Sequence, residues 1–484
     1  MNEAAVLAGV PKGLLIGGTW REAETGGHFG VEDPATGDVL CEVADARALD
    51  GAAALDAAAG AGADWARTAP RERGEILRRA FDAIAAQTDE LALLMTLEMG
   101  KPLAESRAEV TYANDFLRWF SEEAARIDGR YSSAPNGKGR LLTMKQPVGP
   151  CLLITPWNFP LAMGTRKIGP AIAAGATMVV KPARATPLSM LKLAEILGDA
   201  GLPDGVLNVL TTTRSGDLID PLLDDPRLRK LSFTGSTEVG AKLAARAASK
   251  VLRISMELGG NAPFVVFGDA DLDAAIDGAM IAKMRNMGEA CTSANRFLVH
   301  SSLVDEFSRR LAGRMAGLRL GRGTDPEVDV GPLIDEDARA KVAELVDDAR
   351  GRGARCLTGG EAVDRPGYFY RPTVVVDLPA DARLLHEEVF GPVAPIVSFE
   401  TDGEALDQAN GTEFGLVAYV YTRDLTRALH VSEALEVGMV GLNQGLVSNA
   451  AAPFGGVKQS GFGREGGYEG IEEYLETKYV AIGV

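Results

Sequence analysis

From residue 150 onwards, short apolar runs alternate with longer segments whose apolar residues have helical spacing. The runs up to residue 260 contain the sequences CLLITP, TMVVKP, VLNVL, KLSFTG and ISMELGG. A second series begins with APFVVFG at 262–268 and continues to about residue 443. Strands that alternate with helices of this size form right-handed βαβ units, in which helices cover both faces of a parallel sheet. The sequence therefore predicts an α/β fold with two doubly wound parallel-sheet domains.

The chain before residue 150 has a different pattern. LLIGGTW at 14–20 predicts a hairpin, and the alanine-rich patch at 52–63 predicts a helix. Longer helical patterns cover 71–99 and 103–127, and an extended segment follows at 139–149. A chain of 484 residues exceeds one ordinary hydrophobic core, so two or three domains are expected.

Charge and composition limit the class of protein. A net charge of −17 argues against nucleic-acid binding, which requires a basic face. The sequence contains no run of 18 apolar residues, so no membrane span is expected. The N-terminal MNEAAVLAGVPKG has the features of neither an export nor a transit signal. Four cysteines without CxxC spacing suit a reducing compartment and indicate no zinc site. We expect a cytoplasmic enzyme without a metal, in which an anionic substrate would need a local positive pocket.

Two short motifs carry the chemistry. MELGGN at 256–261 ends an apolar strand with Glu257, and NMGEACTSANR at 286–296 places Cys291 on a loop before the strand FLVH. A thiolate can attack a carbonyl carbon, and a carboxylate can then activate the water that releases the product. The four histidines lie in no context typical of a catalytic site, so a carboxylate base is favoured. A Cys–His pair stays open as an alternative, because such partners can be distant in sequence.

Two further motifs allow a structural as well as a functional reading. SFTGSTEVG at 232–240 places Gly235 at a strand end and Ser236 at a helix start, where free N–H groups suit either a pyrophosphate or a simple helix cap. This motif is not the G-x-G-x-x-G fingerprint of a standard Rossmann fold. Asn158 in PWNFP can cap the helix that follows, or its neutral amide can stabilise an oxyanion without transferring a proton.

Taken together, these motifs resemble those of the aldehyde dehydrogenase superfamily. The resemblance rests on E-L-G-G-N, on the 34 residues from Glu257 to Cys291 and on G-E-A-C-x-x-x-x-R, and it extends over nearly the whole chain. It implies that Cys291 is the nucleophile, that Glu257 activates water, and that Asn158 stabilises the oxyanion together with the Cys291 backbone N–H. The implied reaction passes through a thiohemiacetal and a thioester at Cys291.

The same resemblance implies where the cofactor binds. F-T-G-S-x-x-x-G is the family's variant of the dinucleotide turn, and in EEVFGP at 387–392 the family holds the nicotinamide end of the cofactor. Arg184 stands where NAD-preferring relatives often carry a glutamate, and an arginine there would attract a 2′-phosphate. NADP is therefore favoured over NAD, with a solvated loop arginine as the alternative reading. The expected cofactor-binding residues are Trp157, Lys181, Pro182, Ala183, Arg184, Gly235, Ser236, Leu258, Glu388 and Phe390.

The likeness is closest to succinate-semialdehyde dehydrogenases, through KMRNMGEAC at 283–291 and GLVSNAAAPFGGVKQSGFGREG at 445–466. In those enzymes arginines near the nucleophile bind the distal carboxylate of the substrate. The matching positions are Arg166, Arg285 and Ser448, so they are the expected substrate-binding residues. Both arginines are also expected to lower the pKa of the Cys291 thiol.

The chain departs from the family pattern beside the nucleophile. Many relatives carry a second cysteine two residues after the first, which permits a redox-closing disulfide. Ser293 stands there in this chain, so this switch is expected to be absent. Met287 and Glu289 also differ from the commonest alanine-type and glutamine choices.

By resemblance, three parts are expected. Segments 1–128 and 148–257 form an NAD(P)-binding domain, 258–443 a catalytic domain, and 129–147 with 444–484 a small β element for oligomerisation, so that a homodimer or homotetramer is expected. Succinic semialdehyde is the favoured substrate, with glutaric semialdehyde or a neutral aldehyde as the near alternative. An inactive binding or structural protein on the same scaffold and a cofactor-free thiol hydrolase or acyltransferase are the alternatives from other classes.

Overall fold

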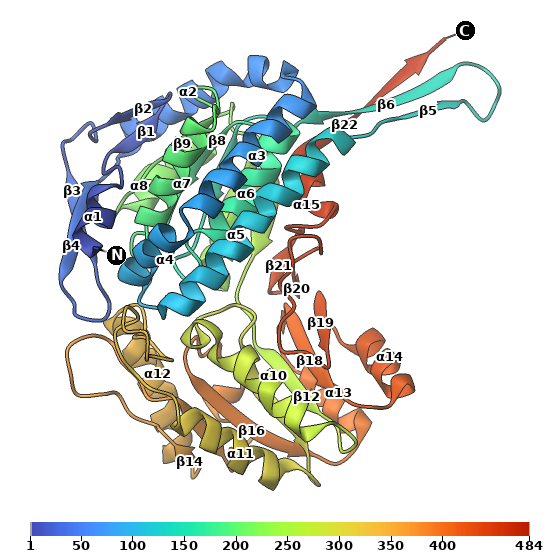
Figure 1. Cartoon of the computed structure of the whole chain (residues 1–484). Coiled ribbons are helices and arrows are strands. Elements are labelled where there is room, and N and C mark those ends of the chain that lie inside the picture. Colours follow the sequence, from blue (N-terminus) through green and yellow to red (C-terminus); the bar gives the residue numbers. More distant parts are fainter. Residues whose placement is uncertain (1, 484) are drawn as a thin grey trace.

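The computed structural model describes residues 2–483, which form two α/β bodies and a projecting three-stranded arm (Figure 1). The first body is built on an eight-stranded sheet with the order β2-β1-β9-β8-β7-β10-β11-β21. Its five central strands are parallel: β7 (Cys151–Ile154), β8 (Met178–Lys181), β9 (Leu207–Val209), β10 (Lys230–Thr234) and β11 (Arg253–Glu257). Antiparallel strands lie at its two edges: β1 (Leu14–Ile16), β2 (Thr19–Arg21) and β21 (Gly461–Phe462).

Helices cover both faces of this sheet because alternate strand residues point to opposite sides. Cys151 and Leu153 of β7 pack into one buried cluster, and Leu152 and Ile154 pack into another. The first cluster includes residues of α3 (Pro70–Ala86), α4 (Thr88–Met99), α5 (Leu103–Glu123), α6 (Ala162–Ala174) and α7 (Leu188–Asp199). The second includes residues of α2 (Ala48–Arg67), α8 (Ser215–Asp224) and α9 (Thr237–Ala248).

The helical pattern over 71–99 forms two helices rather than one. The backbone leaves helical geometry at Gln87, where φ is −110° and ψ is 19°. This break allows α4 to turn into the core, where every residue from Leu91 to Met99 is buried. The sequence pattern did not show the break, because apolar residues continue at helical spacing on both sides of it.

The second body is built on a seven-stranded sheet with the order β14-β15-β16-β13-β12-β18-β19. All neighbours are parallel except β14 and β15. Its strands are β12 (Ala262–Val266), β13 (Ala294–His300), β14 (Arg355–Thr358), β15 (Thr373–Val376), β16 (Val393–Phe399), β18 (Val417–Tyr421) and β19 (Met439–Leu442). One face packs against α10 (Leu272–Met284) and α11 (Val304–Ala316), and the other against α13 (Asp402–Asn410) and α14 (Leu425–Ala434). Two doubly wound sheets are therefore present, as predicted.

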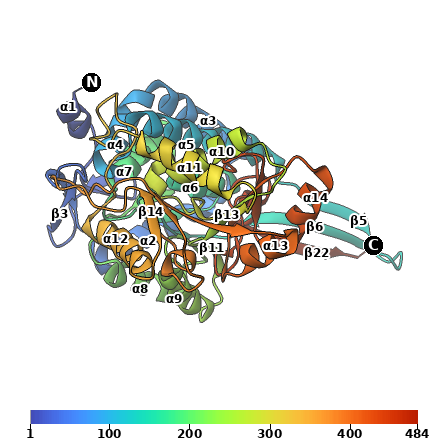
Figure 2. The ribbon, with the colours of Figure 1, turned by 90° about the horizontal axis from the view of Figure 1, so that it is seen from below.

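The arm consists of β5 (Arg130–Ser133), β6 (Arg140–Pro147) and β22 (Leu475–Ile482), all antiparallel, and both views show it extending beyond the two bodies (Figures 1 and 2). Only the end of segment 444–484 belongs to it. Strand β21 of that segment joins the first sheet, and β20 (Val457–Lys458) pairs with β17 (Phe414–Gly415). The remaining elements are α1 (Glu3–Ala8), β3 (His28–Glu32), β4 (Val39–Ala44), α12 (Glu336–Gly351), α15 (Glu469–Glu472) and short 3-10 turns at Ala124–Arg126, Arg285–Gly288 and Arg383–Leu385.

Among residues 2–483, no helix combines the length and the apolar content that a membrane crossing requires.

Candidate active site

A cavity of about 260 Å³ lies where the carboxyl ends of β10 and β11 meet the loop before β13. Strand ends of parallel sheets are the usual place for ligands in α/β proteins. Nine of the residues singled out from the sequence line this one cavity: Trp157, Asn158, Gly235, Ser236, Glu257, Leu258, Cys291, Glu388 and Phe390. The fold thus brings together residues that are up to 233 positions apart in the chain.

Cys291 follows a strained turn. Asn286 and Met287 have φ of 55° and 54°, a left-handed conformation that non-glycine residues rarely adopt. The carboxylate of Glu105 on α5 accepts a hydrogen bond from the backbone N–H of Asn286 at 2.5 Å, and the Asn286 amide donates to the carbonyl of Glu289 at 2.8 Å. Strain held by surrounding bonds is a recurrent property of catalytic loops.

Burial raises the pKa of the Cys291 thiol to about 12, and the charges of Arg166 and Arg285 only partly oppose this. The two arginines act in the expected direction, but desolvation outweighs them, because it penalises the thiolate more than the two nearby cations stabilise it.

Asn158 is buried and firmly held. Its backbone carbonyl accepts hydrogen bonds from Lys101 Nζ at 2.8 Å and Asn286 Nδ2 at 3.0 Å. Its side-chain nitrogen donates to the Glu289 carbonyl at 3.0 Å, which uses one of the two amide N–H groups. The second N–H is left for an oxyanion.

The Glu257 carboxylate, unlike the Asn158 side chain, is not held by hydrogen bonds from the residues that the structure describes. The side chain is 3 % exposed, yet neither carboxylate oxygen has a hydrogen-bond partner among residues 2–483. Burial and then the charge of Glu465 raise the pKa of Glu257 well above its ordinary value, against Arg166, Lys167 and Arg464. A carboxyl with a strongly raised pKa and no partner is typical of an acid–base group.

Glu465 is the acid beside Glu257. It accepts a hydrogen bond from Arg166 Nε at 2.8 Å and one from Lys167 Nζ, and all three side chains are at most 6 % exposed. These two cations more than offset the desolvation of the Glu465 carboxyl and hold its pKa below the ordinary range.

The turn before α9 has the geometry of an anion-binding helix start. Gly235 follows β10, Ser236 is the N-cap of α9, and the Ser236 side chain makes no capping bond. A Cβ at Gly235 would lie 2.5 Å from the Phe233 ring, so a larger residue here would force this ring to move. The first N–H groups of α9 are thus available to a pyrophosphate, which fits a dinucleotide.

The segment 387–391 closes the other end of the cavity. Phe390 has φ of 53°, and its ring stands edge-on to Trp157 with 5.4 Å between ring centroids. Glu388 accepts a hydrogen bond from the Gly260 N–H at 3.1 Å, and Lys341 Nζ donates to the Glu388 carbonyl at 2.8 Å. Two aromatic rings and a carboxylate suit a nicotinamide ribose.

The adenosine-end residues do not line this cavity. Lys181 ends β8 and is buried, which lowers its pKa to about 8 by desolvation. Pro182 is buried, Ala183 is half-buried, and Arg184 is exposed on the loop that follows. This loop leaves the carboxyl end of a strand two places from β10 in the sheet, a position that suits an extended dinucleotide.

The three expected substrate-binding residues have unequal roles. Arg285 Nη1 lies 3.4 Å from Ser448 Oγ, and its guanidinium lies 4.7 Å from the centroid of the Phe159 ring. Within residues 2–483, no acid forms an ion pair with Arg285. Arg166 is paired with Glu465, and its Nη2 lies 2.5 Å from Glu465 Oε2 without hydrogen-bond geometry. The uncompensated cation is therefore Arg285.

Four charged residues of the site were missed from the sequence: Lys101, Lys167, Lys341 and Glu465. Lys101, between α4 and α5, contacts Glu109 and the carbonyl of Asn158, and Lys167 lies on α6, in which every residue is buried. For Lys167 the available signal was a charge within an otherwise apolar helix, since fully buried charges are rare unless they are paired. Glu465 lies in a glycine-rich tail and carried no comparable signal.

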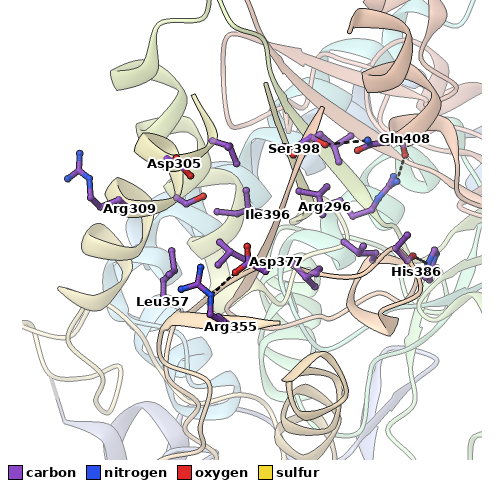
Figure 3. Close-up of a pocket in the computed structure, with 18 of the residues that line it drawn as sticks. Arg296, Asp305, Arg309, Arg355, Leu357, Asp377, His386, Ile396, Ser398 and Gln408 are labelled. Atoms are coloured by element: carbon purple, nitrogen blue, oxygen red, sulfur yellow. Dashed lines mark hydrogen bonds and ion pairs between the residues drawn. The ribbon is translucent and has the colours of Figure 1, made fainter. Parts of the chain in front are cut away.

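A larger cavity of about 720 Å³ lies away from these residues, between α11, β16 and the loop after β15 (Figure 3). Two of its arginines are satisfied within the chain. Arg355 pairs with Asp377 at 2.6 Å, and Arg296 donates to the carbonyls of Asn261, Gln408 and Ala409. It contains none of the nucleophile, acid or amide groups described above, so the smaller cavity is the candidate active site.

Comparison with known proteins agrees with this geometry. A model of the aldehyde dehydrogenase family matches residues 20–480. The succinate-semialdehyde dehydrogenase of Paenarthrobacter nicotinovorans is 60 % identical over 92 % of this chain and 99 % of its own. The NADP(+) succinate-semialdehyde dehydrogenase of Escherichia coli is 50 % identical, and the glutarate-semialdehyde dehydrogenase of Pseudomonas aeruginosa 48 %, each over 97 % of both chains. The solved structure of an E. coli NADP-dependent enzyme is 49 % identical and superposes with a TM-score of 0.97 over all of both chains.

Proposed function

The chain belongs to the aldehyde dehydrogenase family, and we propose that it oxidises succinic semialdehyde to succinate with NADP as the hydride acceptor. The observation that carries the substrate class is Arg285, a half-buried cation without an ion pair, beside Ser448. Taking up a carboxylate in a partly dry site requires a paired cation, since an unpaired ion there is costly. The names of the two relatives at 60 % and 50 % identity support the same substrate.

The proposed mechanism begins with Cys291. Its sulfur attacks the aldehyde carbon, and the carbonyl oxygen accepts hydrogen bonds from the second N–H of the Asn158 amide and from the Cys291 backbone. A nicotinamide, which Trp157, Glu388 and Phe390 would hold, would serve as the hydride acceptor, and loss of the hydride would leave a thioester at Cys291. Glu257 then takes a proton from the water that attacks the thioester carbon, and the C–S bond breaks to release the acid. Arg166, Lys167 and Arg464 favour the charged form of Glu257 and so partly oppose the burial that raises its pKa.

The preference for NADP rests on Arg184. Its exposed guanidinium lies after the strand end at Lys181, where it can form charge-assisted bonds with a 2′-phosphate. Relatives named as NADP(+) enzymes support this choice, and NAD is the alternative cofactor.

The arm supports a proposal about assembly. Among the described residues 2–483, strand β5 pairs only with β6, and Tyr131 and Tyr479 are exposed at 67 % and 58 %. An unpaired edge with exposed aromatic rings favours a homodimer or homotetramer. We further propose a cytoplasmic location, because four cysteines without CxxC spacing suit a reducing compartment. We also propose that the first body binds the cofactor and that the second supplies the nucleophile.

The deciding experiment is steady-state kinetics with succinic semialdehyde, glutaric semialdehyde and butanal, each with NADP and with NAD. The proposal requires the highest kcat/KM for succinic semialdehyde with NADP. Glutaric semialdehyde as the best substrate would assign the neighbouring activity that one relative at 48 % identity carries. Equal values for all three aldehydes would contradict a carboxylate-binding site.

A further inference from the structure

Tyr112 on α5 carries a buried hydroxyl that the mechanism above does not use. The oxygen has less than 1 Å² of exposed surface and no hydrogen-bond partner among residues 2–483. Buried hydroxyls in folded proteins nearly always have a partner, and leaving one without a partner is destabilising. An unpaired hydroxyl therefore requires an explanation.

The surroundings of Tyr112 belong to the substrate side of the site. The Arg285 guanidinium lies 5.8 Å from the centroid of the Tyr112 ring and 4.7 Å from that of Phe159, the residue next to Asn158. The Tyr112 ring stands edge-on to Phe116 at 5.0 Å, and the Arg166 guanidinium lies 5.9 Å from the Phe116 ring. Tyr112 thus places a hydroxyl-bearing ring beside Arg285, and its neighbour Phe116 lies beside Arg166.

Arg285 has bonding capacity left at this point. It contacts Ser448 Oγ at 3.4 Å and pairs with no acid among residues 2–483, whereas Arg166 already pairs with Glu465. An incoming carboxylate offers about four acceptor positions, of which a bidentate Arg285 fills about two and Ser448 about one. A phenolic O–H is a neutral donor that completes such a set without adding a charge.

We propose that the Tyr112 hydroxyl donates a hydrogen bond to the distal carboxylate of the substrate and so determines specificity for carboxylate-bearing aldehydes. This inference rests on the proposed function, because it assigns a further donor to the same distal site. A tyrosine selected only for packing against Phe116 and Arg285 would need its ring and not its hydroxyl, so removing the oxygen distinguishes the two roles.

The test is Tyr112→Phe, which keeps the ring and removes the donor. We expect kcat/KM for succinic semialdehyde to fall about 5- to 30-fold, mainly through KM, while butanal changes less than about twofold. Succinate, used as a competitive inhibitor of butanal oxidation, should bind more weakly by a similar factor. That inhibition constant reports on carboxylate binding alone, and a purely structural residue would not change it selectively.

The matched control is Tyr370→Phe. The Tyr370 hydroxyl is also buried and without a partner, but it lies in the apolar cluster with Leu345, Val375 and Val393 in the second body. Removing this hydroxyl should leave kcat/KM for both aldehydes and the inhibition constant of succinate unchanged. If Tyr112→Phe lowers kcat/KM equally for the two aldehydes, or changes it for neither, the assignment of Tyr112 is overturned.

A separate variant keeps this test apart from that of the proposed function. Arg285→Ala reports on the carboxylate site as a whole. Suppose that Arg285→Ala lowers kcat/KM selectively for succinic semialdehyde and Tyr112→Phe does not. The proposed function is then supported and the Tyr112 inference is overturned. If Arg285→Ala lowers kcat/KM equally for both aldehydes, the assignment of the distal carboxylate site is wrong, and the Tyr112 inference is overturned with it.

Discussion

Two charged regions border the same catalytic cavity, and they are built in opposite ways. In the first, Arg166 and Lys167 share Glu465 as their counter-ion, so each cation is paired within the chain although the trio keeps one net positive charge. In the second, Glu257 has no hydrogen-bond partner and Arg285 no ion-pair partner within the described residues 2–483. The first, which we call the closed region, stabilises the fold and sets the charge around Glu257. The second, which we call the open region, keeps Glu257 and Arg285 available to bind water and substrate.

The largest expected effect comes from the open region. Glu257→Gln should lower steady-state turnover by about 10²- to 10⁴-fold, because no carboxylate then activates water at the thioester. Rapid mixing with NADP and succinic semialdehyde should still show about one equivalent of reduced cofactor per site, followed by a stall. Cys291→Ala is the control and should show neither burst nor turnover. Normal turnover in Glu257→Gln would assign the base to another residue.

The same variant also tests the comparison through stability. The pKa of Glu257 is raised in the folded protein, so folding favours the protonated carboxyl. Its contribution to stability is complete below the ordinary glutamate pKa and is lost as the pH rises towards the folded value. Urea unfolding from pH 4 to 8 should therefore show the wild type losing stability relative to Glu257→Gln. A constant difference across this range would show that Glu257 is not perturbed.

A substitution in the closed region should lower the free energy of unfolding more than it lowers activity. Glu465→Ala leaves Arg166 and Lys167 buried without their counter-ion, which should cost about 3–5 kcal/mol in the free energy of unfolding. Glu122→Ala removes half of the exposed pair with Arg118 and serves as the control, with an expected loss below about 1 kcal/mol. Similar losses in the two variants would mean that the buried pair does not stabilise the fold.

Arg285→Ala should separate substrate binding from stability. We expect a loss of about 2–4 kcal/mol in kcat/KM for succinic semialdehyde, which is on the order of 30- to 1,000-fold. Butanal, which lacks a carboxylate, should lose much less. Denaturation should change little, because Arg285 makes no ion pair that the substitution would break within residues 2–483. A large loss of stability would place Arg285 in the closed region instead.

The smallest effect is expected at the exposed end of the cofactor site. Arg184→Glu should reverse the preference between NADP and NAD by about 1–3 kcal/mol in kcat/KM, since one charge-assisted bond becomes a repulsion. Titration of each dinucleotide, followed by protein fluorescence, measures the same change without turnover. An unchanged ratio would reduce Arg184 to a solvated loop residue.

Much of the fold could be predicted from periodicity, and its limits have physical causes. The alternation from residue 150 predicted both parallel sheets, because a strand buried on two faces must be continuously apolar. The break at Gln87 and the return of β21 to the first sheet had no such signal. Both depend on which distant surface each segment packs against, and local propensity does not contain that information.

For the candidate site, Cys291, Glu257 and Asn158 were found because each lies in a motif whose residue types are unusual for a loop or helix start. Lys101, Lys167 and Glu465 were missed because a buried ion pair has no fixed spacing in the sequence. Lys167 and Glu465 are 298 residues apart and meet only when α6 packs beneath the glycine-rich tail. The sequence predicted that Arg166 and Arg285 lower the Cys291 pKa, but it could not show that desolvation outweighs them, since nearby cations can be inferred from motifs and the extent of burial cannot.

The sequence by itself predicted the candidate reacting groups, the alternation of strands and helices from residue 150, and the presence of arginines suited to an anionic substrate and a phosphorylated cofactor. These are properties of residue type and of short-range order. Only the tertiary structure decided which charges are paired, which remain open and which groups are dry. Arg166 and Arg285 are the same residue type with the same expected role, yet one is neutralised by Glu465 and the other is not. Charge compensation and burial depend on three-dimensional neighbours, and the packing of the two bodies supplies them.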